Sequence, residues 1–228
     1  MQQNQKIIIS GSRGLIGRTI TSALKESGYG IIELDLTLGH DLTDEIFVKD
    51  FFIKNHSYGL INLFALNDHV DSERISNKLM DIDLITFDKY LKVNLTALFS
   101  VCREFARNNE SGSIVNFTST YGVLSPNPKL YNGDEKNIAY GISKAGVIQL
   151  TRHLAVHLAP RIRVNCIMPG GVRHKQNREF QKKYNKLTPM GRMMEAEELV
   201  GMVLLLVSKQ SSYCSGAVYA VDGGWTAW

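Results

Sequence analysis

The sequence has 228 residues, with 26 Lys and Arg against 22 Asp and Glu, so its formal net charge is only +4. A charge this small does not indicate a nucleic-acid partner, and no apolar run approaches the ~18 residues of a membrane span. Because 44% of the residues are hydrophobic, the chain can bury one large core, and we expect residues 1–228 to form a single domain.

The cysteines and histidines predict neither disulfides nor a metal site. Cys102, Cys166 and Cys214 lie far apart in apolar runs, which indicates reduced core residues of a cytoplasmic protein. His153 and His157 stand four residues apart, as two ligands on one helix would, but no third ligand accompanies them. The start of the chain is short and polar, unlike a signal peptide.

A glycine-rich turn follows a short apolar segment, Lys6–Ser10, that predicts a buried strand, and a helix over residues 18–27 comes next. In this order Gly11 permits a tight turn, while Gly14 and Gly17 allow close approach of a pyrophosphate and close helix packing. Amides at the helix start would hold the phosphates. A glycine turn without a ligand is the alternative. The predicted dinucleotide contacts are Gly11, Ser12, Arg13, Leu15, Ile16 and Gly17.

Asp35 closes the second predicted strand, residues 30–35. An acid at this place accepts hydrogen bonds from the adenosine ribose and repels a 2′-phosphate. The next residue is Leu36 rather than arginine, so the sequence favours NAD over NADP as the cofactor. Arg13 is the contrary sign, because its side chain could reach a phosphate.

The remaining elements alternate between helices and strands. Residues 37–44 leave no room for a helix, so we expect a shortened crossover after strand 2 with a stub of strand near Asp41. Asp44 caps a predicted helix that ends near residue 56, a buried strand covers residues 59–65, and a long helix spans residues 87–108.

Further elements are expected at residues 112–119, 140–159, 161–167, 195–208 and 216–221. This alternation predicts an α/β fold with a Rossmann-like, doubly wound, mostly parallel sheet and helices on both faces. Ser119 would lie at the carboxyl end of its strand, where such sheets bind ligands.

Tyr140 and Lys144 stand four residues apart on a predicted helix, so both face the same side. A cation near a phenol favours the phenolate, and we expect Lys144 to lower the pKa of Tyr140 toward neutrality. A tyrosine tuned in this way can exchange a proton with an alcohol or carbonyl oxygen. The pair alone leaves open a boundary tyrosine beside a solvated lysine.

A basic segment over residues 173–186 follows the strand that ends at Pro169 and Gly170, with six lysines and arginines against one glutamate. Its position is that of a lid over a substrate, and Arg173 and Arg178 offer a forked grip on phosphate or carboxylate. A solvated helix face is the alternative.

The loop over residues 121–137 would enter the site from the other side. Tyr121, Asn127 and Tyr131 in this loop can hydrogen-bond hydroxyl groups. Together with the basic segment, they predict a polar substrate that carries phosphate or carboxylate, such as a phosphorylated, nucleotide-linked or acidic sugar.

In the order in which they occur, these motifs resemble the short-chain dehydrogenase/reductase family, in its shorter branch, over nearly the whole chain. The matching stretches are the glycine turn, Asp35, Asp41-Leu42, Val93-Asn94, Ser119, Tyr140 with Lys144, Arg163-Val164-Asn165, Pro169-Gly170 and Val221-Asp222-Gly223-Gly224. The stretches Gly171-Val172, 189–193 and 223–228 also resemble a bacterial subgroup associated with sialic-acid-like sugars, such as legionaminic acid.

The resemblance implies roles for individual residues. Tyr140 would be the general acid/base, Lys144 would bind the nicotinamide ribose, Ser119 would hold the substrate oxygen, and Asn94 would anchor a water of the proton relay. The implied substrate contacts therefore include Ser119 and Tyr140 beside the residues of the loop and lid. The implied cofactor contacts outside the glycine turn are Asp35, Asp41, Leu42, Phe64, Ala65, Tyr140, Lys144, Pro169, Gly170 and Val172.

We therefore predict an NAD(H)-dependent oxidoreductase that interconverts a secondary alcohol and a ketone of a small-molecule substrate. A 3-oxoacyl-thioester (acyl-carrier-protein) reductase and a non-catalytic nucleotide-sensing protein are the alternatives. The resemblance also implies a homotetramer, with a dimer next, because the family's long helices commonly pack across two-fold axes. Trp225 and Trp228 make the C-terminal tail apolar, which is consistent with a second interface.

Overall fold

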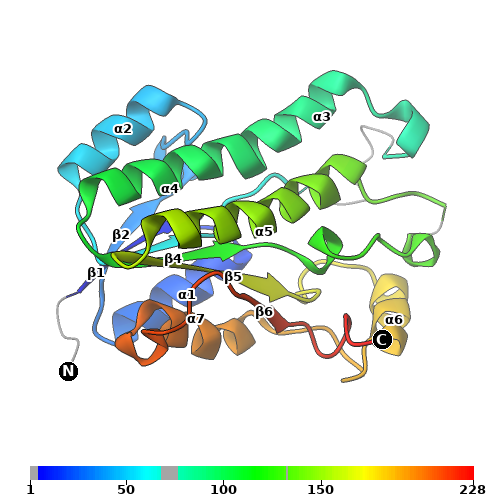
Figure 1. Ribbon diagram of the computed structural model, residues 1–228. Helices are drawn as coiled ribbons and strands as arrows, with labels where there is room; N and C mark the ends of the chain where they lie inside the picture. The colour runs from blue at the N-terminus through cyan, green and yellow to red at the C-terminus, as the bar shows by residue number, and fades with distance from the viewer. Residues whose placement is uncertain (1–4, 68–76, 132) are drawn as a thin grey trace.

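The computed structural model describes residues 5–67, 77–131 and 133–228, and its central feature is a parallel sheet in the order β2-β1-β3-β4-β5-β6 (Figure 1). The strands are β1 (Lys6–Ser10), β2 (Gly30–Leu34), β3 (Gly59–Asn62), β4 (Gly112–Phe117), β5 (Ile162–Pro169) and β6 (Val218–Val221). The helices are α1 (Leu15–Glu26), α2 (Glu45–Lys54), α3 (Leu84–Leu91), α4 (Ala97–Asn108), α5 (Ile138–Leu158), α6 (Arg178–Leu187) and α7 (Val200–Val207). The predicted α/β class and doubly wound order are confirmed.

Helices cover both faces of the sheet, and each face has its own core (Figure 1). Alternate residues of one strand point to opposite faces, so Ile8 packs with α2, α4 and α5 while Ile7 and Ile9 pack with α1 and α7. Apolar residues on both faces explain why the strands read as continuous apolar runs. In the described ranges, no helix has the length and apolar character needed to cross a membrane.

The chain reverses direction across the sheet after β2, which forms one edge. It returns past β1 to form β3 on the other side. The connections that follow β1 and β3 therefore lead to opposite faces of the sheet, and ligands of such sheets bind at this point, outside the carboxyl ends of the strands. The predicted stub of strand near Asp41 is wrong, because this carboxylate accepts hydrogen bonds from the backbone and hydroxyl of Thr43 and folds the segment into a turn. Asp44 caps α2 as predicted.

The predicted long helix is interrupted. Helices α3 and α4 are joined by a π-helical turn, Lys92–Thr96, which inserts one extra residue per turn. Asn94 lies in this turn with only 2% of its surface exposed. A mid-helix asparagine would ordinarily face solvent, whereas the π turn points this one inward.

Candidate active site

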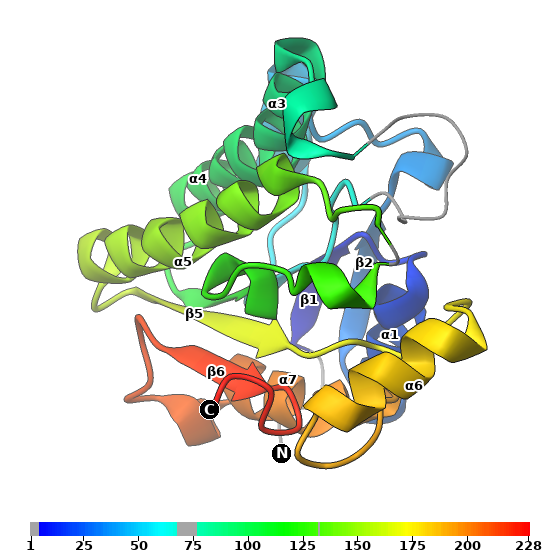
Figure 2. The same cartoon turned by 90° about the vertical axis from the view of Figure 1, so that its right-hand side faces the viewer.

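A cavity of about 830 Å³ opens at the carboxyl ends of the central strands. Its walls come from the glycine turn, the ends of β3, β4 and β5, the start of α5, and α6, which lies beside the C-terminal tail (Figure 2). The sequence-predicted residues that line it are Gly11, Leu15, Ile16, Gly17, Ala65, Ser119, Tyr121, Tyr131, Tyr140, Lys144, Pro169, Gly170 and Val172. The predicted residues that do not line it are Ser12, Arg13, Asp35, Asp41, Leu42, Phe64, Asn94, Asn127, Arg173 and Arg178.

The glycine turn leaves no room for a side chain at Gly11 or Gly17. Gly11 has φ +73°, and a Cβ there would lie 2.5 Å from the Phe64 nitrogen, while a Cβ on Gly17 would lie 2.1 Å from the Gly11 oxygen. Gly14 begins α1 without any side-chain cap, and the first turn of the helix has no acidic residue. The buried hydroxyl of Ser12 makes no hydrogen bond in the described structure. An uncapped helix start beside a close-packed glycine turn fits the pyrophosphate of a dinucleotide.

The Asp35 carboxylate is hydrogen-bonded to the backbone of the glycine turn. Its Oδ2 accepts a hydrogen bond from the Arg13 backbone nitrogen at 2.9 Å, and its Oδ1 accepts from the nitrogen and hydroxyl of Thr37. Burial acts to raise the pKa of Asp35, but these hydrogen bonds outweigh it and the pKa is lowered. The Arg13 guanidinium turns to Glu33, with Nε 3.0 Å from Oε2, so it does not point into the cavity. Asp35 is therefore an ionised acid next to the glycine turn.

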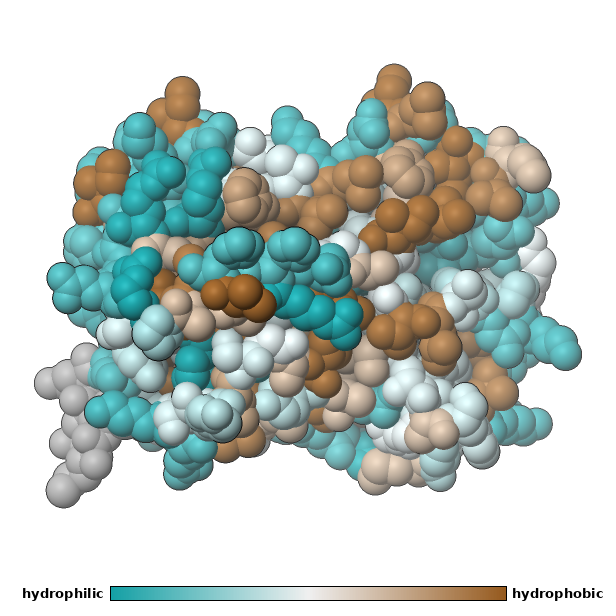
Figure 3. Space-filling view, in the orientation of Figure 1, coloured by the Kyte–Doolittle hydropathy of each residue, from teal (hydrophilic) through white to brown (hydrophobic). Residues whose placement is uncertain are grey.

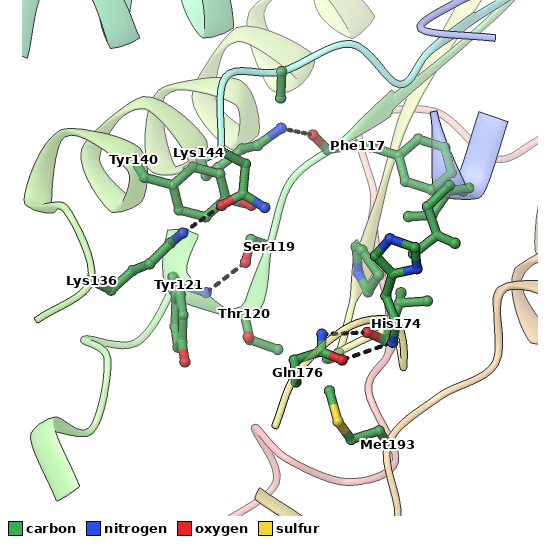
Figure 4. A pocket seen from close by; sticks show the side chains of 18 of the residues that line it. Phe117, Ser119, Thr120, Tyr121, Lys136, Tyr140, Lys144, His174, Gln176 and Met193 are labelled. Carbon is green, nitrogen blue, oxygen red and sulfur yellow. Dashed lines mark hydrogen bonds between the residues drawn. The ribbon is translucent and has the colours of Figure 1, made fainter. Parts of the chain in front are cut away.

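Tyr140, Ser119 and Lys144 meet at the floor of the cavity (Figure 4). Burial raises the pKa of Tyr140, and a hydrogen bond with Ser119 opposes that rise. Lys144 donates from Nζ to the Phe117 carbonyl at 2.9 Å, and burial lowers its own pKa to about 8. The predicted lowering of the Tyr140 pKa by Lys144 is thus wrong for this arrangement, because the phenol is buried and the ammonium is directed at a carbonyl.

Asn94 lies behind the cavity wall. Its Oδ1 accepts from the Leu66 nitrogen at 2.7 Å, and its Nδ2 donates to the Leu66 carbonyl and to the Ser143 hydroxyl, both at 3.0 Å. These contacts join the chain after β3 to the helix that carries Tyr140. Two other residues that the resemblance implied as cofactor contacts do not line the cavity: Leu42 belongs to the hydrophobic core, and the Asp41 carboxylate accepts a hydrogen bond from the Thr43 backbone.

In the basic segment, charged and aromatic side chains lie on different sides. Arg173 forms an ion pair with Glu195 at 2.7 Å, and Arg178 is exposed at the start of α6, so neither predicted anion contact reaches the cavity. The inward side of α6 presents Phe180 and Tyr184 instead. This amphipathic pattern places most of the lysines in solvent, which corrects the expectation that the two arginines grip the substrate.

The two sides of the cavity mouth are tied together by aromatic residues. The hydroxyls of Tyr121 and Tyr131 are hydrogen-bonded, and Tyr131 packs against Phe180 with ring centroids 5.7 Å apart. Tyr184 stacks on Trp225 with centroids 4.3 Å apart. Trp225 is buried within its own chain, so it does not require a subunit interface to cover it.

Several lining residues were not singled out from the sequence: Asn67, Lys136, His174, Lys175, Gln176, Asn177, Phe180, Tyr184 and Met193. Those from His174 to Tyr184 belong to the segment predicted as a lid. No sequence motif marks these residues, and most of them lie outside helices and strands, where spacing predicts little about side-chain direction. Gln176 shapes its segment by donating to the Val172 carbonyl and accepting from the His174 nitrogen (Figure 4).

Comparison with known proteins places this site in a family. A family model described as enoyl-(acyl carrier protein) reductase matches residues 21–226. The chain is 31% identical to a 3-oxoacyl-[acyl-carrier-protein] reductase of Rickettsia bellii, over 96% of each chain. The chain belongs to the short-chain dehydrogenase/reductase family. It is also 29% identical to an uncharacterized short-chain type dehydrogenase/reductase of Sinorhizobium fredii, which it matches over 99% of its own length but only 44% of that protein.

Solved structures of short-chain dehydrogenases superpose closely on this chain. A short-chain dehydrogenase of Leptospira borgpetersenii with bound NAD+ gives a TM-score of 0.88 at 28% identity, covering 98% of this chain and 93% of that one. A candidate 2-deoxy-D-gluconate 3-dehydrogenase of Agrobacterium tumefaciens with bound NADP gives 0.83 at 25% identity, covering 100% and 98%. The enzyme class is therefore an NAD(P)-dependent dehydrogenase/reductase.

Proposed function

We propose that this dehydrogenase interconverts a secondary alcohol and a ketone, with NAD(H), on a polar, anionic, sugar-like substrate. The main support for an anionic substrate is the charge of the residues that line the cavity. The described lining residues include Lys136, Lys144, Lys175 and His174 but no aspartate or glutamate. A wall whose described lining residues carry cations and no carboxylate favours an acidic ligand.

The geometry suits proton transfer at one oxygen. A substrate oxygen near Tyr140 and Ser119 can accept a hydrogen bond from each hydroxyl. Because burial raises its pKa, Tyr140 holds its proton at neutral pH and can give it to a carbonyl oxygen when a ketone is reduced. In the reverse direction the deprotonated phenolate of Tyr140 would take the proton of the alcohol. The Lys144 ammonium places a positive charge in the same part of the cavity as Tyr140 and Ser119. A bound nicotinamide supplies or accepts the hydride.

A substrate screen tests this function. Sugar acids, sugar phosphates, nucleotide sugars, neutral polyols and acyl thioesters would each be mixed with the enzyme and NAD(H), and absorbance at the reduced-nicotinamide band recorded. We expect turnover to be greatest among acidic sugars. A clear preference for neutral polyols or acyl thioesters would contradict the anionic class.

A 3-oxoacyl-thioester reductase is the second candidate. It is favoured by the Rickettsia relative and by the aromatic inner side of α6, where Phe180 and Tyr184 offer apolar surface. A nucleotide-sensing role on the same fold is less consistent with a complete group of Ser119, Tyr140 and Lys144. The narrower resemblance to legionaminic-acid pathways and a cytoplasmic location stay predictions.

NAD is the cofactor that we propose, because ionised Asp35 lies beside the glycine turn and Arg13 is paired with Glu33. Asp35→Ser should reduce the preference for NADH over NADPH, since the carboxylate that repels a 2′-phosphate is removed. The ratio of kcat/KM for the two cofactors measures this preference. Wild-type enzyme that already prefers NADPH severalfold would refute the assignment.

We also propose a homotetramer, with a dimer next. Apolar side chains on the outer faces of α4 and α5 are exposed, among them Phe99 at 42%, Ile142 at 45% and Val156 at 75%. Figure 3 shows apolar patches over the helical upper half of this face. Exposed apolar patches on helices are typical of interfaces. Sedimentation at micromolar concentration should give a tetramer, and a monomer would disprove the proposal.

A further inference from the structure

The helix α6 has a single apolar stripe, and all of it packs into one cluster. Phe180, Tyr184 and Leu187 stand three or four residues apart, so they lie on one side of α6. The members of the cluster from outside the helix are Leu130, Tyr131, Met193 and Trp225. The other residues of α6 are polar or charged, and none of them is buried. The position of α6 beside the cavity therefore depends on this cluster.

Trp225 connects the cluster to the sheet. It lies four residues after the end of β6, in a turn that the Asp222 carboxylate holds together. This carboxylate accepts hydrogen bonds from the Gly224 nitrogen at 3.0 Å, and from the nitrogen and hydroxyl of Thr226 at 2.9 and 2.6 Å. The Trp225 side chain is 8% exposed and stacks on Tyr184 with ring centroids 4.3 Å apart. Trp225 does not line the cavity, whereas Tyr184 does.

The chain that follows α6 packs on the same turn. Gly224 has φ +85°, and a Cβ there would lie 2.8 Å from Cγ of Pro189. The Met190 nitrogen donates to the Gly223 carbonyl at 3.1 Å. Figure 2 shows the C-terminal tail beside α6. The tail therefore contacts the helix and also the segment directly after it.

Tyr184 links this support to the cavity wall. Its hydroxyl accepts a hydrogen bond from the Gly171 nitrogen, just after β5, and a Cβ on Gly171 would lie 2.6 Å from Cζ of Tyr184. Gly171, Phe180 and Tyr184 all line the cavity. A shift of the Tyr184 ring would therefore displace the aromatic wall of the cavity.

We propose that Trp225 is a positioning residue for substrate binding, which holds α6 beside the cavity by stacking on Tyr184. Because Trp225 contacts α6 and does not line the cavity, it should act on the affinity for substrate rather than on proton transfer. The glycine turn is hydrogen-bonded to Asp35, so cofactor binding should not depend on Trp225. This role goes beyond the proposed function and does not depend on the charge of the substrate.

Hydrogen exchange in α6 tests the contact without any substrate. Mass spectrometry would follow the amides of α6, with β4 as reference, in NADH-bound wild type, Trp225→Ala, Trp225→Phe and Trp228→Ala. Trp225→Ala should exchange about tenfold faster in α6 and not in β4, since one aromatic stacking contact contributes up to about this factor. Trp225→Phe keeps a ring on Tyr184 and should restore most of the protection. Trp228 is 78% exposed, so Trp228→Ala is the matched control and should exchange like the wild type.

Steady-state kinetics test the consequence for the reaction. With the compound of the screen above that has the highest turnover, Trp225→Ala should raise KM about tenfold. Its kcat and its Kd for NADH should stay within about twofold of the wild type, because the lost interaction serves ground state and transition state alike. Trp228→Ala should keep all three values.

The proposal is overturned if Trp225→Ala leaves exchange in α6 unchanged, if it speeds exchange in β4 equally, or if Trp228→Ala has the same effect. It is also overturned if kcat falls while KM stays constant. A screen in which no compound is turned over would contradict the proposed function instead, and the exchange measurement would still decide on Trp225.

Discussion

Replacing Tyr140 with phenylalanine should lower kcat by about two orders of magnitude or more, because the variant loses the hydroxyl that exchanges a proton with the substrate. The ring would stay packed against Tyr90 and Ala139, so the fold should be unchanged. Turnover is measured by absorbance of the reduced nicotinamide, and cofactor affinity by NADH fluorescence. We expect the loss in kcat with little change in the Kd for NADH.

Tyr213→Phe is the control for this variant, since its ring is fully exposed and the substitution is the same. It should behave like the wild type. Near-normal turnover of Tyr140→Phe would show that another group moves the proton, and the catalytic assignment of this site would have to be abandoned.

Gly17→Ala should have the second large effect, on both stability and cofactor binding. A Cβ at this position would lie 2.1 Å from the Gly11 carbonyl oxygen and 2.8 Å from the Ser12 backbone, and a backbone neighbour cannot rotate aside. Overpacking typically costs about 1–3 kcal/mol of the free energy of unfolding, and we expect a clash with backbone atoms to lie at the upper end of this range. If the turn opens to accept the methyl group, the amides move away from the pyrophosphate, and NADH affinity should fall at least tenfold.

Gly201→Ala provides the comparison, because a Cβ there meets nothing within 4 Å and the residue lies in α7. It should be neutral or stabilising by up to about 1 kcal/mol, the helix preference of alanine over glycine. Urea unfolding gives the stabilities. A Gly17→Ala protein with wild-type stability and NADH affinity would mean that the turn is looser than the structure shows.

The sequence predicted those parts of the site that rest on local patterns. The apolar runs defined the strands, the glycine turn defined the phosphate end, and the spacing of Tyr140 and Lys144 placed both at one cavity. Ser119 could be placed because a parallel strand carries its carboxyl end to the ligand side of the sheet.

Features that depend on tertiary contacts were not predictable from spacing. The pairing of Arg173 with Glu195 draws that guanidinium away from the cavity, across a separation of 22 residues. Lys136 lies in an irregular loop, and its contact with Asn67 joins segments 69 residues apart. The direction of the Tyr140 pKa shift depends on burial, which a motif does not reveal.

The most direct test of the central claim uses a substrate deuterated at the carbon that bears the reacting hydroxyl. The acidic sugar with the highest turnover in the screen, carrying deuterium on that carbon, would be incubated with the enzyme and NAD+, and the reduced cofactor analysed by mass spectrometry and NMR. The account predicts one deuterium per turnover on the nicotinamide ring, with transfer about two orders of magnitude slower in Tyr140→Phe. Label that stays in the sugar acid or is released to water would contradict it.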